Sequence, residues 1–194
     1  MGYFSDEMIE SEAAALREMM GLPSDSPLSW RDLESRMERA FPGIRLVVVP
    51  NEELRHAAEA DTEQNRIRFR QTAYDQLRAG YEWALEVLAH ELAHFKLDHK
   101  GIRYRSEGLS HGRKRDEPQA HLFARALLAP ARAAVKFSSP AALAAEFHLQ
   151  LSSAEKRLMV VGRMHRVPRA LPQNVINFLT EARARGAEVT ALDD

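Results

Sequence analysis

One segment limits the possible folds of this chain more than any other: residues 81–99, with the sequence YEWALEVLAHELAHFKLDH. Its large apolar residues recur at helical spacing and share one face; they are Leu85, Leu88, Leu92 and Phe95. Residues four apart on a helix lie about 40° apart around the axis, so His90 and His94 point the same way, on another side of the helix. The segment predicts a helix that buries one face in a core and lines a polar site with another.

The remaining sequence predicts a fold in which helices dominate. Apolar residues at helical spacing, interrupted by glycine and proline, indicate further helices. They are expected at residues 6–20, 29–40, from 72 onward, 118–129, near 140–162 and near 172–185. Pro118 is expected in the first turn of its helix, where a missing N–H costs nothing. The polar, glycine-containing stretch 101–116 is expected to be a surface loop.

Two short runs predict strands. Residues 44–49 are β-branched and bounded by Pro50, which favours a strand that we place at the centre of a sheet. Residues 66–70 alternate arginine with Ile67 and Phe69, as a half-solvated strand requires. Residues 51–65 between them stay ambiguous. We therefore expect an α+β fold, mainly helical with a small β-sheet.

Composition narrows the classes of function. The chain has 194 residues, no cysteine and a formal net charge of -1, from 27 basic and 28 acidic residues. Without thiolates, histidine, aspartate and glutamate are the metal ligands to consider. A near-neutral charge disfavours a nucleic-acid partner. No run approaches the roughly 20 apolar residues that span a bilayer, and the acidic N-terminus does not read as a secretory signal, so we expect a cytoplasmic protein without a membrane partner.

The pattern His90-Glu91-Leu92-Ala93-His94 indicates a metal site. Two imidazoles four residues apart supply two zinc ligands from one helical turn. Glu91 lies at the edge of that face, where it can act as general base on a water molecule. A catalytic zinc normally takes three protein ligands and leaves one position open. The candidates for the third ligand are Glu107, Asp116, Glu117, Gln119, His121, His99 and His111.

Among these candidates, Glu117 and His121 can meet on one helix face because they are four residues apart. We choose Glu117 as the ligand and His121 as a neighbour that contacts the ligands, or as an alternative ligand. The competing interpretations are a carboxylate favoured by a helix N-terminus and an ordinary, partly buried helix histidine. Asp98, one turn beyond His94, is a candidate to orient the free nitrogen of that ring. By helical phase, His99 is expected to point away and cap the last carbonyl groups.

Two blocks of this sequence resemble the ImmA/IrrE family of cytosolic zinc metallopeptidases. LAHELAHFKLDH is similar to the family's HELGHxxLHH segment, and EPQAHLFARALLAP is similar to its ExEANxFAxxLLMP segment. The resemblance covers about residues 44–160. It implies one zinc ion per chain, held by His90, His94 and Glu117, with Glu91 as the base; manganese or cobalt suits the same ligands.

The chain departs from the family pattern at three positions. His121 stands where the family has Asn or Asp, and can therefore hydrogen-bond or enter the coordination sphere. Pro118 follows the proposed ligand and biases Glu117 away from helical angles. Ala129 replaces a methionine before Pro130.

Tyr104, His111 or an arginine of the 103–115 loop are the candidates to stabilise the oxyanion of a tetrahedral intermediate.

The resemblance also implies a division of the chain. We expect N-terminal helices over 1–43, a zincin-like metallopeptidase core over 44–135, a helix-turn-helix-like segment over 136–168, and a C-terminal helix with an acidic tail over 169–194. The helix-turn-helix-like segment would have Leu143, Phe147, Leu151 and Leu158 as its core. Two packed helices without a DNA contact are favoured; in the alternative, the basic patch is Lys156, Arg157, Arg163 and Arg166.

These features predict a zinc-dependent endopeptidase. The resemblance implies that its protein substrate is a helix-turn-helix transcriptional repressor, cleaved or inactivated during a stress or mobile-element response. A non-catalytic zinc-binding regulator is the alternative, and a component of a toxin–antitoxin or phage module that acts by protein or DNA binding is another.

Overall fold

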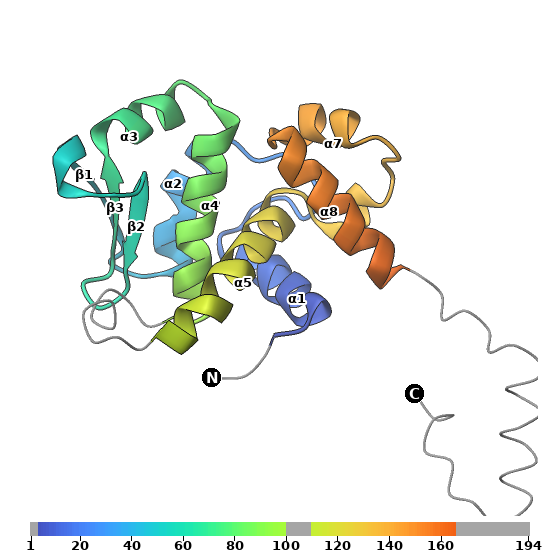
Figure 1. Cartoon of the computed structure of the whole chain (residues 1–194), viewed down its shortest axis with the longest axis horizontal. Coiled ribbons are helices and arrows are strands. Elements are labelled where there is room, and N and C mark those ends of the chain that lie inside the picture. Colours follow the sequence, from blue (N-terminus) through green and yellow to red (C-terminus); the bar gives the residue numbers. More distant parts are fainter. Residues whose placement is uncertain (1–3, 100–109, 166–194) are drawn as a thin grey trace, which may run out of the picture. The chain divides into compact units, whose positions relative to one another are not determined.

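The computed structural model describes residues 4–99 and 110–165, and the side chains of its longest helix from Asp116 onward. This part of the chain contains eight α-helices, one 3-10 helix and a three-stranded sheet (Figure 1). The predicted α+β fold with a small sheet is confirmed. The elements are α1 (Asp6–Met19), α2 (Trp30–Ala40), β1 (Arg45–Val49), η1 (Asn51–Glu53), β2 (Ala58–Asp61), β3 (Arg66–Arg70), α3 (Gln71–Arg78), α4 (Glu82–Lys96), α5 (Ser110–Leu128), α6 (Ala131–Ala134), α7 (Pro140–Phe147) and α8 (Leu151–Met164).

The first two helices begin at serine caps. Ser5 accepts a hydrogen bond from the backbone of α1. Before α2, Ser29 and Asp32 form a reciprocal capping box, in which Asp32 accepts from the Ser29 backbone N–H at 2.8 Å. Such caps satisfy N–H groups that have no partner inside the helix. The predicted helix start near Ser29 is confirmed.

The sheet has the strand order β1-β3-β2, with β1 parallel and β2 antiparallel to β3. The prediction of a central strand at residues 44–49 is wrong, because β1 is an edge strand and β3 lies in the middle. Ile67 and Phe69 of β3 are fully buried while its arginines are partly exposed, which confirms the half-solvated alternation. The ambiguous stretch 51–65 supplies η1 and β2.

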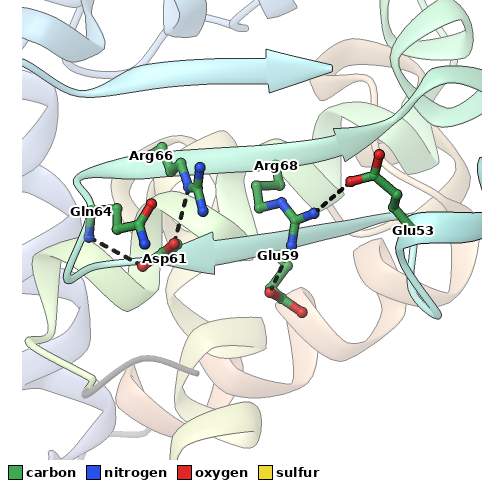
Figure 2. A network of polar contacts seen from close by, with 6 residues as sticks. All are labelled: Glu53, Glu59, Asp61, Gln64, Arg66 and Arg68. Atoms are coloured by element: carbon green, nitrogen blue, oxygen red, sulfur yellow. Dashed lines mark hydrogen bonds and ion pairs between the residues drawn. The ribbon is translucent and has the colours of Figure 1, made fainter. Parts of the chain in front are cut away.

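The turn between β2 and β3 is closed by a buried carboxylate. Asp61 is 5% exposed and accepts hydrogen bonds from Arg66 Nε at 3.0 Å and from the backbone N–H of Gln64 at 3.1 Å (Figure 2). A buried charge is tolerated when it is paired and hydrogen-bonded in this way. The contacts therefore hold β2 in register at the open edge of the sheet.

Helix α4 packs against both β2 and α5 (Figure 1). It ends at Lys96, three residues before the predicted end at His99. Asp98 has a positive φ of 52°, and the His99 N–H donates to the carbonyl of His94 at 2.9 Å. This is the Schellman arrangement, in which one left-handed residue turns the chain back over the last helical turn. The turn brings His99 back toward the helix.

Helix α5 starts at Ser110, so the prediction of a loop up to residue 116 is wrong for its last part. Pro118 consequently lies inside the helix and not in its first turn. Glu117 is helical despite preceding a proline. A proline inside a helix removes one backbone hydrogen bond, and packing of α5 against α4 and α1 offsets that loss.

Helices α7 and α8 form the expected helix pair. Leu143 and Phe147 are buried as predicted, and Leu158 packs partly against the core. Leu151 is 53% exposed, so its placement in the core is wrong, and the buried Leu149 in the connecting turn takes that role. Leu151 is the first residue of α8 and is exposed together with Ser152, whereas the next two residues, Ser153 and Ala154, face the core.

By its internal contacts the chain divides into a unit of residues 1–164 and a second unit of residues 165–194. In the first, one cluster of buried apolar residues extends from Ile9 in α1 to Val161 in α8. The finer boundaries at 43/44 and 135/136 stay predictions. The helix predicted near 172–185 and the tail at 169–194 lie outside the described residues, as does Arg166. None of the described helices is long and apolar enough to cross a membrane.

Candidate metal centre

Three ligand atoms converge where α4 faces α5. His90 Nε2 lies 3.1 Å from His94 Nε2 and 3.3 Å from one carboxylate oxygen of Glu117. His94 Nε2 lies 3.8 Å from the other oxygen. Suitable atoms of all three residues lie within 4.8 Å of one another. The two histidines lie on one face of α4 because they are four residues apart, and their rings meet at 73° to each other. Helix α5 brings the carboxylate of Glu117 to them.

These distances fit a tetrahedral metal ion. Zinc binds nitrogen and oxygen ligands at about 2.0–2.2 Å, and a tetrahedron of that size has edges of about 3.3–3.6 Å. The two histidine nitrogens are 3.1 Å apart, and they lie 3.3 and 3.8 Å from different oxygens of Glu117, which is close to this value. Two imidazole nitrogens and one carboxylate oxygen are also the donor types that zinc accepts in open sites. The residues therefore suit a divalent cation with room for one more ligand.

Electrostatics keep the carboxylate of this group ionised. Hydrogen bonding by the His90 side chain, opposed by burial and assisted by the charges of nearby histidines, lowers the pKa of Glu117 to about 2. Glu117 remains 48% exposed, toward the open side of the site. An ionised carboxylate is the form that binds a cation.

The three side chains open into a cleft of about 830 Å³. Glu91, the predicted base, is 7% exposed and belongs to the lining of this cleft. The opposite wall is the segment from η1 to β2. There Arg68 lies 3.0 Å from Glu53 and 3.8 Å from Glu59, and so ties η1 to β2 across β3 (Figure 2). The cleft thus has one helical wall with the candidate ligands and one wall formed by the sheet.

His121 lies beside the three converging side chains without being one of them. Its ring centroid is 4.4 Å from that of His90. Desolvation, followed by the charges of His90 and Arg125, lowers the pKa of His121 below its ordinary value. A neutral imidazole in this place can hydrogen-bond or offer a lone pair, so the structure leaves both predicted roles of His121 open.

His99 is a residue whose position the sequence analysis predicted wrongly. It was expected to point away, but it is 4% exposed and its Nδ1 lies 3.1 Å from His94 Nδ1. Burial lowers the pKa of His99, although Asp116 and Gln119 oppose this effect. Asp98, the predicted partner of His94, is exposed. The signal that would have revealed His99 is the left-handed turn at Asp98, which helical phase ignores. Tyr104 and the side chain of His111 lie outside the described part.

Two imidazoles one helical turn apart, a carboxylate from the next helix and a buried glutamate in the same cleft are the arrangement expected of an HExxH-type metal site. The family model Peptidase_M78, the IrrE N-terminal-like domain, matches residues 84–159 of this chain. The resemblance to the ImmA/IrrE family seen in the sequence is confirmed by this match. It suggests a function of the metallopeptidase or regulator type.

The fold also resembles a solved structure. A Mycobacterium tuberculosis transcriptional regulator aligns with a TM-score of 0.57 at 18% sequence identity. The alignment covers 86% of this chain and 58% of the solved chain. At this identity the similarity shows the fold alone. No curated protein matches the sequence.

Proposed function

We propose that this protein is a zinc-dependent endopeptidase, with one zinc ion held by His90, His94 and Glu117. The observation that supports the proposal most is the convergence of these three side chains in a cleft that Glu91 also lines. The match of residues 84–159 to a peptidase family adds to it. An open site with three protein ligands is typical of catalytic zinc, whereas structural zinc sites have four.

Each residue has a distinct task in this proposal. When bound, zinc supplies Lewis-acid polarisation of the scissile carbonyl and of water. Glu91 accepts the proton of the attacking water and delivers it to the leaving amine nitrogen. His90, His94 and Glu117 fix the position at which this happens, and the wall formed by η1 and β2 confines the peptide. Tyr104 and His111 stay our candidates for oxyanion stabilisation.

We further propose that the substrate is a helix-turn-helix repressor, cleaved in the cytoplasm in a stress or mobile-element response. The resemblance to ImmA/IrrE proteins supports this substrate class. A comparison of new protein N-termini in source cells that contain the wild type or Glu91→Gln tests it. A repressor fragment that requires Glu91 supports the proposal, and cleavage confined to unrelated proteins contradicts it.

Substitution of the proposed base tests the reaction itself. Glu91→Gln should retain one zinc per chain and lose about 10²- to 10⁴-fold in cleavage rate, the usual contribution of a general base. Cleavage of a peptide library and elemental analysis measure the two quantities. Glu82→Gln, an exposed residue of the same helix, is the matched control and should cleave like the wild type. Wild-type cleavage by Glu91→Gln would show that the mechanism is wrong.

A non-catalytic zinc-binding regulator is the second candidate, because His121 lies close enough to His90 to supply a fourth, closing ligand. Elemental analysis of Glu117→Ala and His121→Ala separates the two candidates. Loss of zinc in Glu117→Ala alone supports the open site. Loss of zinc in both variants favours the closed regulatory site with four ligands, whereas loss in His121→Ala with Glu117→Ala unaffected would show that His121 is the third ligand in place of Glu117.

A further inference from the structure

His99 is a buried histidine to which the proposed reaction assigns no task. It follows the left-handed residue Asp98 and contacts His94 twice. Its backbone N–H donates to the His94 carbonyl at 2.9 Å, and its Nδ1 lies 3.1 Å from His94 Nδ1. On its other side, its Nε2 lies 3.3 Å from Oε1 of Gln119 on α5. The ring therefore bridges α4 and α5 directly behind one candidate metal ligand.

The directions of the hydrogen bonds follow from the side of the ring that faces the cleft. His94 points Nε2 at His90 and Glu117. A neutral imidazole with a free lone pair at Nε2 carries its proton at Nδ1, so His94 Nδ1–H must donate. His99 Nδ1 is then the acceptor.

The same reasoning applies to the next contact in the series, which joins His99 to Gln119. If His99 accepts at Nδ1, its own proton lies at Nε2, which must donate. The group it meets is the amide oxygen of Gln119, which can only accept. The carboxylate of Asp116, 3.9 Å from the same nitrogen, is also an acceptor. Every position along the series fits one arrangement of protons, and that arrangement leaves the lone pair of His94 facing the cleft.

We propose that His99 is a positioning residue, which with Gln119 fixes the tautomer and the ring orientation of His94 for metal binding. The inference rests on the proposed metal site. Partners of this kind typically change metal affinity by about 10- to 100-fold when removed. The effect falls on one ligand, because Nδ1 of His90 is buried without a hydrogen-bond partner among the described residues.

Two matched pairs of variants, tested in the purified full chain, probe the positioning of His94 by His99 and Gln119. His99→Phe fills the space but offers no acceptor, whereas His99→Asn keeps an oxygen near the position of Nδ1. Gln119→Leu removes the terminal acceptor, whereas Gln119→Glu keeps one. Zinc affinity is measured by competition with a chromophoric chelator, and the geometry of the site by the visible absorption spectrum of bound Co²⁺. Circular dichroism of the metal-free variants reports their folding.

We expect His99→Phe to bind zinc about 10- to 100-fold more weakly and to change the Co²⁺ spectrum. His99→Asn should recover most of the affinity, and Gln119→Leu should bind more weakly than Gln119→Glu. A folded His99→Phe with wild-type affinity overturns the proposal, as does an equal loss in His99→Phe and His99→Asn, which would indicate a packing role. If His99→Phe does not fold, the Gln119 pair decides by the same criterion. Failure of the wild type to bind zinc would contradict the proposed function instead.

Discussion

Two helix pairs of this protein place polar side chains in buried surroundings and use them in opposite ways. In the pair α4–α5, His90, His94 and Glu117 face one another around a cleft. Nδ1 of His90 has no partner within the described part of the chain. In the pair α7–α8, Arg157 is 1% exposed, donates from Nε to the carbonyl of Ala129 at 2.7 Å and pairs with Glu10 of α1.

The comparison shows how to separate polar residues that stabilise a fold from those that serve a ligand. Buried polar groups in folded proteins are normally satisfied, and exceptions concentrate at functional sites. Arg157 follows the rule with two of its three nitrogens, which connect α8 to α1 and to the end of α5, while its second terminal nitrogen has no partner among the described residues. The histidines of α4 follow it only in part, since the space between them suits a cation. The same contacts bear on the basic patch that a DNA-binding role would need. Of its arginines, Arg157 faces the core and Arg163 pairs with Asp6 at 2.8 Å.

We expect the largest effect from a substitution that breaks the polar contacts of α8. Arg157→Met leaves Glu10 and the Ala129 carbonyl without their partner, and removal of one member of a buried pair costs about 3–5 kcal/mol. The free energy of unfolding, measured in urea, should fall by about that amount. Arg163→Met is the matched control on the same helix, since its pair is largely exposed and worth at most about 1 kcal/mol. Equal losses in the two variants would contradict the distinction between them.

Zinc should have the next largest effect, and it acts on the other helix pair. A ligand at 100 times its dissociation constant stabilises the folded state by about 2.7 kcal/mol, which for a domain of this size raises Tm by about 5–10 °C. His94→Leu should abolish the rise because one of the three ligands is lost. Thermal unfolding with zinc and with a chelator measures both proteins. The same rise in His94→Leu would place the zinc elsewhere in the chain.

The sequence predicted those parts of the site that depend on local spacing. His90, Glu91 and His94 lie in one helical turn, and their relative directions follow from the helix alone. The choice of Glu117 among several acidic residues and histidines rested on its four-residue spacing from His121, and the resemblance to a family implied the same ligand. Helix geometry alone could not predict its contact with α4, because that contact spans more than 20 residues of sequence. The contacts of α4 with α5 now agree with that choice.

The wrong predictions share a physical cause, because each concerns a position that is set by tertiary packing and not by the local sequence. His99 was expected on the far side because helical phase was extended through Asp98, whose left-handed φ turns the chain back. Residues 44–49 were expected at the sheet centre because they are β-branched, but strand neighbours are selected by packing, which makes β1 an edge. Leu151 was expected in the core, but it is exposed, and Leu149 is buried there instead.

The smallest expected effect lies at the contact between the two helix pairs. Glu86 of α4 accepts hydrogen bonds from the backbone N–H of Gln150 and from the Ser153 hydroxyl, both at 2.6 Å, and thereby caps the start of α8. Burial raises the pKa of Glu86, while these hydrogen bonds lower it and limit the shift. The folded chain therefore holds this proton more tightly than the unfolded chain does.

The sign of the pH dependence follows from that difference. The stabilising contribution of Glu86 is fully present below its ordinary pKa and is lost as the pH rises through its raised value in the folded state. Glu86→Gln removes this titration and keeps an oxygen acceptor for α8. The difference in unfolding free energy between the wild type and Glu86→Gln, measured without metal from pH 4 to pH 8, should move against the wild type as the pH rises. A difference that moves in favour of the wild type would mean that the hydrogen bonds from α8 outweigh burial, and Glu86 would then resemble Arg157 as a residue that serves the fold.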